Sequence, residues 1–423
     1  MSTVRLRHLA DINPLTPAFD HLANDEDLTF LPMEAVWPGE RLDISRHRTK
    51  ESVATGYTRF QDGDVLVPKI TPTFEAGRAV LVHGLRRGVG AGSTELHVLR
   101  PGPLIDPRFL LYVVNTYPFL KKGEAEMYGV AGQQRVPDTF LRDLPVNLPP
   151  LEEQRRIADF LDTETAHFQA LTSKRNSQLE GLAERELALI VATLAGGGRK
   201  GEGKPTGWPW LPTIPADWSI GPVYAYFSTE LGKMLNADRA SGPDQRPYLR
   251  NANVHWYTIE TDDLATMDFS ANEVSRYSVR QGDLLVCEGG AGVAEAAVWD
   301  GRLQECYFQK SLHRVRRAGP VPVEWLMYWL RLAKACGVFE AEGNIATIPH
   351  LTGEQLRQCR IPIPIDGDSL IKRTSEEIAV LTSIRTKLRE AQAVLAERRQ
   401  ALITAAVTGQ IDVSTASGRG IEE

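Results

Sequence analysis

Residues 149–198 read PPLEEQRRIADFLDTETAHFQALTSKRNSQLEGLAERELALIVATLAGGG, and Gly181 is the one glycine between the opening prolines and the closing glycines. Proline suits the first turn of a helix, acidic side chains favour its N-terminus, and glycine is common just after its end. The stretch therefore predicts one helix over 149–195. A helix of roughly 44 residues is about 65 Å long, which exceeds the core of one small domain.

A second long helix is predicted over 367–409. Its leucines recur every seventh residue from Leu381 to Leu402, a spacing typical of helices that pair along an apolar seam. In the first helix the apolar steps are less regular. The predicted helix-pairing residues are Ile157, Leu161, Phe168, Leu171, Leu182, Leu189, Ile378, Leu381, Leu388, Leu395 and Leu402. The alternative is that each helix packs only on its own globular domain.

The sequence also repeats itself. Four pairs of segments match in the same order: FQDGDVLV at 60–67 with VRQGDLLV at 279–286, FLRDLPVNLP at 140–149 with QLRQCRIPIP at 355–364, LTSKR at 171–175 with LTSIR at 381–385, and LAER at 182–185 with LAER at 395–398. Their offsets lie between 210 and 219 residues. Ordered matches at nearly one offset indicate an internal duplication, in which each copy ends in a long helix.

Each copy begins with a segment rich in glycine, proline and β-branched residues, whose short alternating runs are typical of strands. Helices are expected within it at 109–122 and 323–335. We predict an α+β fold, internally duplicated, with two β-rich globular domains separated by two long α-helices that pair as an antiparallel coiled coil. The predicted parts are globular domain 1 at 1–148, a long helix at 149–195, a flexible linker at 196–207, globular domain 2 at 208–366, a second long helix at 367–409 and a tail at 410–423.

Composition bounds the class of protein. The 423 residues are 42% hydrophobic and 24% charged, with 48 basic and 54 acidic side chains and a net charge of −6. This excludes a disordered chain or a polycation that coats nucleic acid, so any DNA binding would use local basic patches. The four cysteines are not spaced as zinc pairs, and no segment has the apolar length of a signal peptide or membrane span. We expect a cytoplasmic protein without a membrane partner.

No catalytic or metal-binding motif is recognisable. NLPPL at 147–151 lacks the aromatic residue of an amino-methyltransferase tetrapeptide, and EGGAGVAE at 288–295 lacks the third glycine of a dinucleotide loop. Paired histidines of the HExxH type and a Gly-x-Ser-x-Gly elbow are also missing from the sequence. We predict no catalytic residue, no metal and no cofactor in this chain.

Polar and basic residues instead cluster in the loops of both globular domains. Arginine and lysine suit guanine edges and phosphates, asparagine and glutamine suit adenine edges, and threonine methyls suit thymine. For any one residue the alternative is a solvated surface side chain. The predicted DNA-binding residues are Lys69, Thr71, Arg78, Gln133, Gln134 and Arg135 in the first domain, and Arg250, Asn251, Asn253, Gln309, Lys310 and Arg314 in the second.

PVNLPPLEEQRRIADFLD at 145–162 resembles the opening of the central conserved helix of specificity (S) subunits of type I restriction–modification systems. GDVLV, GDLLVCEGG, YLRNANV at 248–254 and QQRVP at 133–137 are similar to segments of that family's target recognition domains. The resemblance covers about 1–410, in the family's order of domain, helix, domain and helix. The second copy departs from the helix signature, reading IPIPIDGDSLIKRTSEEI at 361–378.

The resemblance implies a function for each part. Each target recognition domain would read one half of a bipartite double-stranded DNA sequence. The paired helices would set the spacer and dock two methyltransferase (M) subunits, which carry S-adenosylmethionine and modify adenine. Two restriction (R) subunits would use ATP and magnesium to translocate and cut DNA. This chain would be the non-catalytic subunit.

Three alternatives remain open at this point. The nearest is the specificity subunit of a modification-only system, which has no R subunit. A second is a coiled-coil scaffold whose domains bind proteins only, and a third is a relative of a fused nuclease–methyltransferase. The missing catalytic motifs count against the third, and DNA selectivity would exclude the second.

If each domain reads its own half of the DNA target, Gln134→Ala should change the selection of one half-site only. Because Gln134 belongs to one domain, its loss should relax or abolish selection in one half-site and leave the other intact. Mapping methylated adenine in cells that contain the variant and its M subunit would measure both halves. Equal loss at both halves would contradict modular reading.

Overall fold

A computed structural model describes residues 2–36, 42–130, 132–199, 201–235, 240–341 and 350–413. The chain forms two compact units: unit 1 comprises Met1–Asn176 with Leu388–Glu423, and unit 2 comprises Ser177–Lys387. Both long helices therefore contribute one part to each unit, so each unit has its own helix pair.

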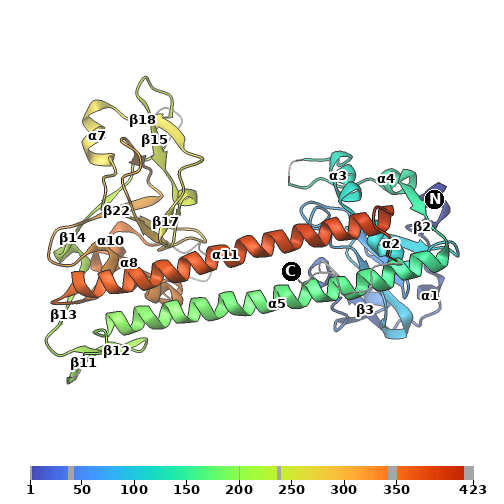
Figure 1. Cartoon of the computed structure of the whole chain (residues 1–423), viewed down its shortest axis with the longest axis horizontal. Coiled ribbons are helices and arrows are strands. Elements are labelled where there is room, and N and C mark those ends of the chain that lie inside the picture. The colour runs from blue at the N-terminus through green and yellow to red at the C-terminus, as the bar shows by residue number, and fades with distance from the viewer. Residues whose placement is uncertain are drawn as a thin grey trace. The chain divides into compact units, whose positions relative to one another are not determined.

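Unit 1 contains two four-stranded sheets and a separate strand pair (Figure 1). The first sheet has the order β2-β9-β6-β7, from Ala10–Ile12, Leu96–Pro101, Val65–Pro68 and Val80–Leu81. The second has the order β4-β3-β8-β5, from His47–Thr49, Asp27–Leu31, Val89–Gly92 and Thr58–Gln61, with β3 and β8 parallel. Strand β1 (Ser2–Arg5) pairs antiparallel with β10 (Pro145–Leu148).

Short helices connect these strands. They are α1 (Pro17–Asp20), α2 (Pro107–Val113), α3 (Tyr117–Ala125) and α4 (Asp138–Asp143), with 3-10 turns η1 (Leu6–His8), η2 (Met33–Ala35), η3 (Glu51–Val53) and η4 (Arg86–Gly88). The single helix expected at 109–122 is wrong, because two helices occupy this region. Pro118 lies in the first turn of α3, and proline there lacks the N–H that an uninterrupted helix would need.

The first sheet of unit 2 repeats the strand order of the first sheet of unit 1. β14-β22-β19-β20 comprise Phe227–Leu231, Leu312–Arg317, Leu284–Cys287 and Ala296–Val298, and β13 (Ser219–Pro222) pairs with β23 (Arg360–Ile363). A three-stranded sheet, β18-β15-β21, comprises Ala265–Asp268, Gln245–Leu249 and Tyr307–Phe308, with β15 and β21 parallel. The remaining elements are β16 (Val254–His255), β17 (Thr258–Ile259), α7 (Ala271–Tyr277), α8 (Val323–Ala335), α9 (Val338–Ala341), α10 (Gly353–Gln358), η5 (Val223–Ala225) and η6 (Asn251–Asn253).

Part of the predicted flexible linker is ordered. Residues 203–207 belong to β11 (Gly203–Trp208), which pairs antiparallel with β12 (Leu211–Pro215). The hairpin is held by apolar side chains, because Leu211 and Ile214 are buried and the ring of Trp208 stacks on Trp210 at 5.3 Å. The glycines at this point form a turn that leads into a packed hairpin.

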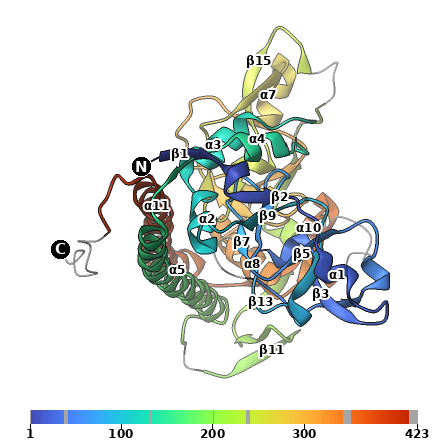
Figure 2. The same cartoon turned by 90° about the vertical axis from the view of Figure 1, so that its right-hand side faces the viewer.

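The two long helices are confirmed. Helix α5 spans Leu151–Leu194 and helix α11 spans Gly367–Thr408, and they lie beside one another in both views (Figure 1, Figure 2). In unit 1 one core contains Ile157, Ala158, Leu161, Ile403, Ala406 and Val407. In unit 2 one core contains Ile190, Leu194, Ile371 and Ile378. Each helix pair is thus part of the core of its unit.

The predicted helix-pairing residues differ in burial. Ile157, Leu161, Ile378 and Leu381 are buried, whereas Phe168, Leu182, Leu189, Leu388, Leu395 and Leu402 are partly buried. Leu171 is 36% exposed, which does not support a seam position for it. Polar contacts occur nearby instead, because Arg175 Nη1 donates to the carbonyl of Ala391 at 2.6 Å and Gln392 Nε2 donates to Asn176 Oδ1 at 2.6 Å.

A buried carboxylate joins the helix pair to the globular part of unit 2. Glu186 of α5 is 1% exposed and accepts hydrogen bonds from Tyr257 Oη at 2.7 Å, from Arg331 Nε of α8 at 2.9 Å and from Arg385 Nη2 of α11. Burial opposes its ionisation, but the hydrogen bonds and the positive charges outweigh burial and lower its pKa. Glu186 is therefore charged and paired at neutral pH.

Replacing Glu186 with alanine should destabilise unit 2 by roughly 3–5 kcal/mol, because two partly buried arginines would lose their fully buried partner. The matched control is Glu184→Ala, at an exposed position of the same helix. Denaturant unfolding of both variants measures the free energies of unfolding. Because the pKa is lowered by folding, this contribution is present above the unfolded pKa and is lost as the pH falls through the folded value. Equal stability of the two variants would contradict the role given to Glu186.

Candidate nucleic-acid interface

In unit 1 the structure brings together five of the six predicted DNA-binding residues. Lys69 and Thr71 follow β6, and Arg135 forms isolated antiparallel bridges with Ile70 and with Tyr128. The backbone N–H of Thr71 donates to the carbonyl of Gln134 at 3.0 Å, and the N–H of Gln134 donates to Thr71 Oγ1 at 3.2 Å. The two segments therefore form one polar surface.

Glu95 orients the arginine of this surface. Arg135 Nε and Nη2 donate to the two carboxylate oxygens of Glu95 at 2.8 and 2.7 Å, and these hydrogen bonds lower the pKa of Glu95. Lys69 Nζ donates to the carbonyl of Thr94 at 2.9 Å, and burial lowers the pKa of Lys69. Sequence reasoning missed Glu95, because only the fold brings it to Arg135 across 40 residues.

The sixth predicted residue, Arg78, is half-buried after the turn that follows Thr71. Lys69 also lines a hollow of about 380 Å³ together with Tyr57 and Arg59. The guanidinium of Arg59 lies 4.0 Å from the ring centre of Phe19, so part of the positive charge around the hollow is held in place by an aromatic face.

In unit 2 the parallel pairing of β15 with β21 places the carboxyl ends of both strands side by side. Arg250 and Asn251 follow the first strand, and Gln309 and Lys310 follow the second. The N–H of Gln309 donates to the carbonyl of Leu249 at 3.0 Å, which fixes this arrangement. These four predicted residues are therefore close together.

Their side chains differ in availability. Lys310 is exposed, and Gln309 is half-buried. Asn251 Nδ2 donates to the carbonyl of Gly289 at 2.7 Å, whereas Arg250 Nη2 donates to Asp263 Oδ2 at 2.7 Å. Asn251 connects the ends of these strands to the loop after β19.

Asn253 and Arg314 have structural surroundings that do not fit base contact. Asn253 is 4% exposed, and its Oδ1 accepts the backbone N–H of Arg250 at 3.1 Å. Arg314 is 7% exposed and Nη1 donates to the carbonyls of Arg276 and Ser278 at 2.7 Å each. Burial lowers the pKa of Arg314 to about 10. Both side chains brace the protein's own backbone, so their prediction as DNA-binding residues is corrected here.

A matched pair of buried histidines supports these surfaces in the two units. His97 Nε2 lies 3.0 Å from the carbonyl of Val136, and His313 Nε2 lies 2.8 Å from the carbonyl of Leu351. Burial lowers the pKa of His97 from 6.5 to about 4 and also lowers the pKa of His313. Each neutral imidazole thus ties a sheet to the loop that leads to α4 or α10.

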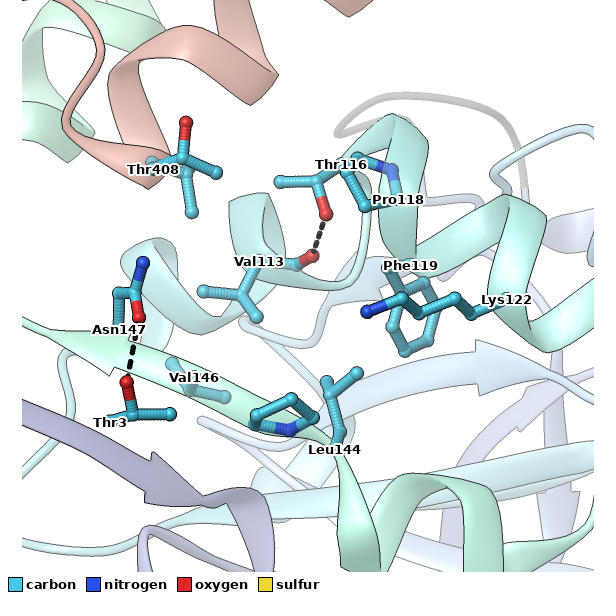
Figure 3. Close-up of a pocket in the computed structure, with 12 residues that line it drawn as sticks. Thr3, Val113, Thr116, Pro118, Phe119, Lys122, Leu144, Val146, Asn147 and Thr408 are labelled. Atoms are coloured by element: carbon cyan, nitrogen blue, oxygen red, sulfur yellow. Dashed lines mark hydrogen bonds between the residues drawn. The ribbon is translucent and has the colours of Figure 1, made fainter.

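Figure 3 shows a separate hollow of unit 1, with a volume of about 360 Å³, lined by residues of β1, α2, α3, β10 and α11. Thr3 Oγ1 donates to Asn147 Oδ1 at 3.1 Å on its wall. Among the described residues that line it, Lys122 alone is ionisable, and a single lysine does not form a catalytic arrangement. Within the described ranges, moreover, no group of three or more histidine, cysteine or acidic side chains could hold a metal ion.

The histidine pair predicts acid sensitivity. A lowered folded pKa means that the stabilisation is complete above the unfolded pKa of 6.5 and is lost as the pH falls towards 4. His97→Gln should therefore reduce the loss of unfolding free energy between pH 7 and pH 5, a loss that reaches roughly 3 kcal/mol near pH 4 for a shift of this size. Denaturant unfolding at both pH values measures it, with exposed His83→Gln as control. An unchanged pH dependence in His97→Gln would refute this assignment.

Comparisons with known proteins agree with the resemblance to type I specificity subunits. Residues 59–181 match the family model described as the type I restriction modification DNA specificity domain. The chain is 40% identical over 156 residues to the type I restriction enzyme EcoAI specificity subunit of Escherichia coli, and 38% identical over 158 residues to the EcoEI specificity subunit of the same organism. Each alignment covers 36% of this chain and 26% of the relative, so the match spans about a quarter of the relatives' length.

The whole fold also has a solved counterpart. A chain from a structure described as the basis of complex assembly and conformational transition of the type I R-M system superposes with a TM-score of 0.68. It covers 97% of this chain and 98% of its own length at 16% identity, which is a likeness of fold. The resemblance to type I specificity subunits is confirmed: residues 59–181 match the type I restriction modification DNA specificity domain, and the relatives that align with the chain are type I specificity subunits.

Proposed function

We propose that this chain is the non-catalytic DNA specificity subunit of a type I restriction–modification complex, in which each β-rich domain reads one half of a bipartite DNA target. The observation that carries this proposal is the repeated strand order of the two units, combined with the specificity domain in the first. In each unit polar residues lie together on loops, after β6 in unit 1 and after β15 and β21 in unit 2, where side chains are available for base edges.

The long helices would pair as an antiparallel coiled coil that separates the two recognition domains and sets the DNA spacer. Contacts within unit 2 support this direction, because Thr193 of α5 contacts Thr374 of α11, and Glu186 contacts Arg385. The partner residue thus moves forward along α11 as the position moves back along α5. Exposed apolar side chains on α11, such as Val380 and Val394, are available for a protein partner.

The chemistry would belong to partner subunits. Two M subunits would bring S-adenosylmethionine, and two R subunits would bring ATP and magnesium. A net charge of −6 makes this chain alone a weak general ligand of DNA. Binding would depend on the local surfaces around Lys69 and Lys310 and on the assembled complex.

The proposed place of action is the cytoplasm. The four cysteines all lie within the described residues and form no disulfide bond, as expected in a reducing compartment. Among the described helices, none combines the length with the apolar character that a bilayer crossing requires.

The test is a genome-wide map of methylated adenine in cells that contain the cognate M subunit, with and without this chain. Deletion of the chain should abolish methylation of one gapped, two-part motif. An M subunit shown to be active on its own DNA with an unchanged methylome would refute the proposed function and favour a protein-binding scaffold.

A further inference from the structure

The two units share one set of backbone hydrogen bonds, around Lys69 in unit 1 and around Glu288 in unit 2. We call this set the framework. The N–H of Lys69 donates to the carbonyl of Glu95 at 2.8 Å, and in unit 2 the N–H of Glu288 donates to the carbonyl of Ser311 at 2.9 Å. By these hydrogen bonds, Lys69 is structurally equivalent to Glu288, and Glu95 to Ser311.

A second set of bonds extends the match. The N–H of Val136 donates to the carbonyl of Lys69 at 2.9 Å, and the N–H of Leu351 donates to the carbonyl of Glu288 at 2.6 Å. The adjoining isolated bridges pair Ile70 with Arg135 in unit 1, and Gly289 with His350 in unit 2. Position 135 thus matches position 350.

The base of the framework is the same in both units as well. The carboxylate of Asp64 accepts hydrogen bonds from Arg100 Nε and Nη2 at 2.8 and 2.9 Å. The carboxylate of Asp283 accepts hydrogen bonds from Arg316 Nε and Nη2 at 2.6 and 2.8 Å. Together with the two buried histidines, these pairs fix the strands from which the three positions project. The backbone is therefore constant while the projecting side chains are free to differ.

The side chains at the three matched positions differ in chemistry, and at the first position the charge is reversed. Unit 1 presents Lys69, Glu95 and Arg135, and unit 2 presents Glu288, Ser311 and His350. Arg135 is a cation whose Nε and Nη2 are held by Glu95, while Nη1 donates to the carbonyl of Gln133 at the longer distance of 3.3 Å. Its side chain is still 41% exposed. At the first position a half-buried lysine is replaced by a half-buried glutamate.

We propose, on the basis of the proposed function, that these three positions are the base-selecting centre of each domain and make its two half-sites different. Arg135, oriented by Glu95, would donate to the O6 and N7 acceptors of a guanine in the first half-site. Glu288 would accept from the exocyclic amino group of a base, cytosine above all, in the second half-site. Glu95 is then a positioning residue, and Arg135 and Glu288 are the specificity-determining residues.

The experiment maps methylated adenine in cells that contain the M subunit and either the wild-type chain or a variant. Glu288→Gln should lower discrimination at one position of the second half-site by about tenfold or more and leave the first half-site unchanged. The double variant Glu95→Gln with Arg135→Gln removes both partners of one ion pair, so that no charge remains unpaired. It should lower discrimination at a guanine of the first half-site only.

Matched controls lie on the helices that follow each loop. Glu354→Gln in α10 and Arg142→Gln in α4 change the same residue types at exposed positions outside the framework, and both should keep the wild-type motif. The total level of methylation reports whether each variant folds and assembles. Lys69→Gln is a second single substitution in unit 1 that leaves the Arg135–Glu95 pair in place, and it too should affect the first half-site only.

The outcomes separate the two proposals. If the wild-type chain directs no gapped motif, the proposed function fails and this inference fails with it. If the wild-type chain directs a motif that Glu288→Gln and the double variant leave unchanged, or change in both halves alike, this inference alone is overturned. A change confined to the expected half-site in each variant supports it.

Discussion

The buried carboxylate of Glu186 is the constraint on which the arrangement of unit 2 depends. A charge that is 1% exposed is tolerated only when it is paired, and its partners come from α8, α11 and the segment that contains Tyr257. These contacts fix the rotation of α5 and α11 relative to the globular part of unit 2. The apolar contacts of Ile190 and Ile378 also stabilise the unit, but they constrain the rotation of the helices less.

The globular parts of the two units share the same arrangement of buried polar contacts. The same bonds recur around Lys69 and Glu288, around His97 and His313, and around Asp64 and Asp283. A backbone held by buried polar contacts allows the projecting side chains to vary without loss of the fold. This explains how a duplicated chain could present two different surfaces to DNA.

Much of the fold could be predicted from the spacing of apolar residues, from the internal repeat and from the positions of glycine and proline. The repeat of GDVLV as GDLLV marked matched strands, and the glycine-poor stretches marked α5 and α11. The break between α2 and α3 and the β11–β12 hairpin were missed, because a proline at 118 and a glycine-rich stretch at 196–207 each allow two local structures that packing decides.

The site was less predictable, because exposure and pairing are tertiary properties. The structure brings five of the predicted polar residues of unit 1 together from two loops, but Asn253 and Arg314 are buried supports, and Glu95 was not predicted from the sequence. Residue type suggests what a side chain can bind, whereas only the framework shows whether it is already occupied by the protein's own backbone.

The most direct test of the central claim is DNA binding by the chain reconstituted with its methyltransferase subunits. The duplexes would carry the motif found in cells, intact or with one half replaced at a time, at fixed salt concentration. The account predicts strong binding of the intact duplex and weak binding of both half-replaced duplexes. Equal binding of all three, or indifference to one of the halves, would contradict the claim that each unit reads half of the target.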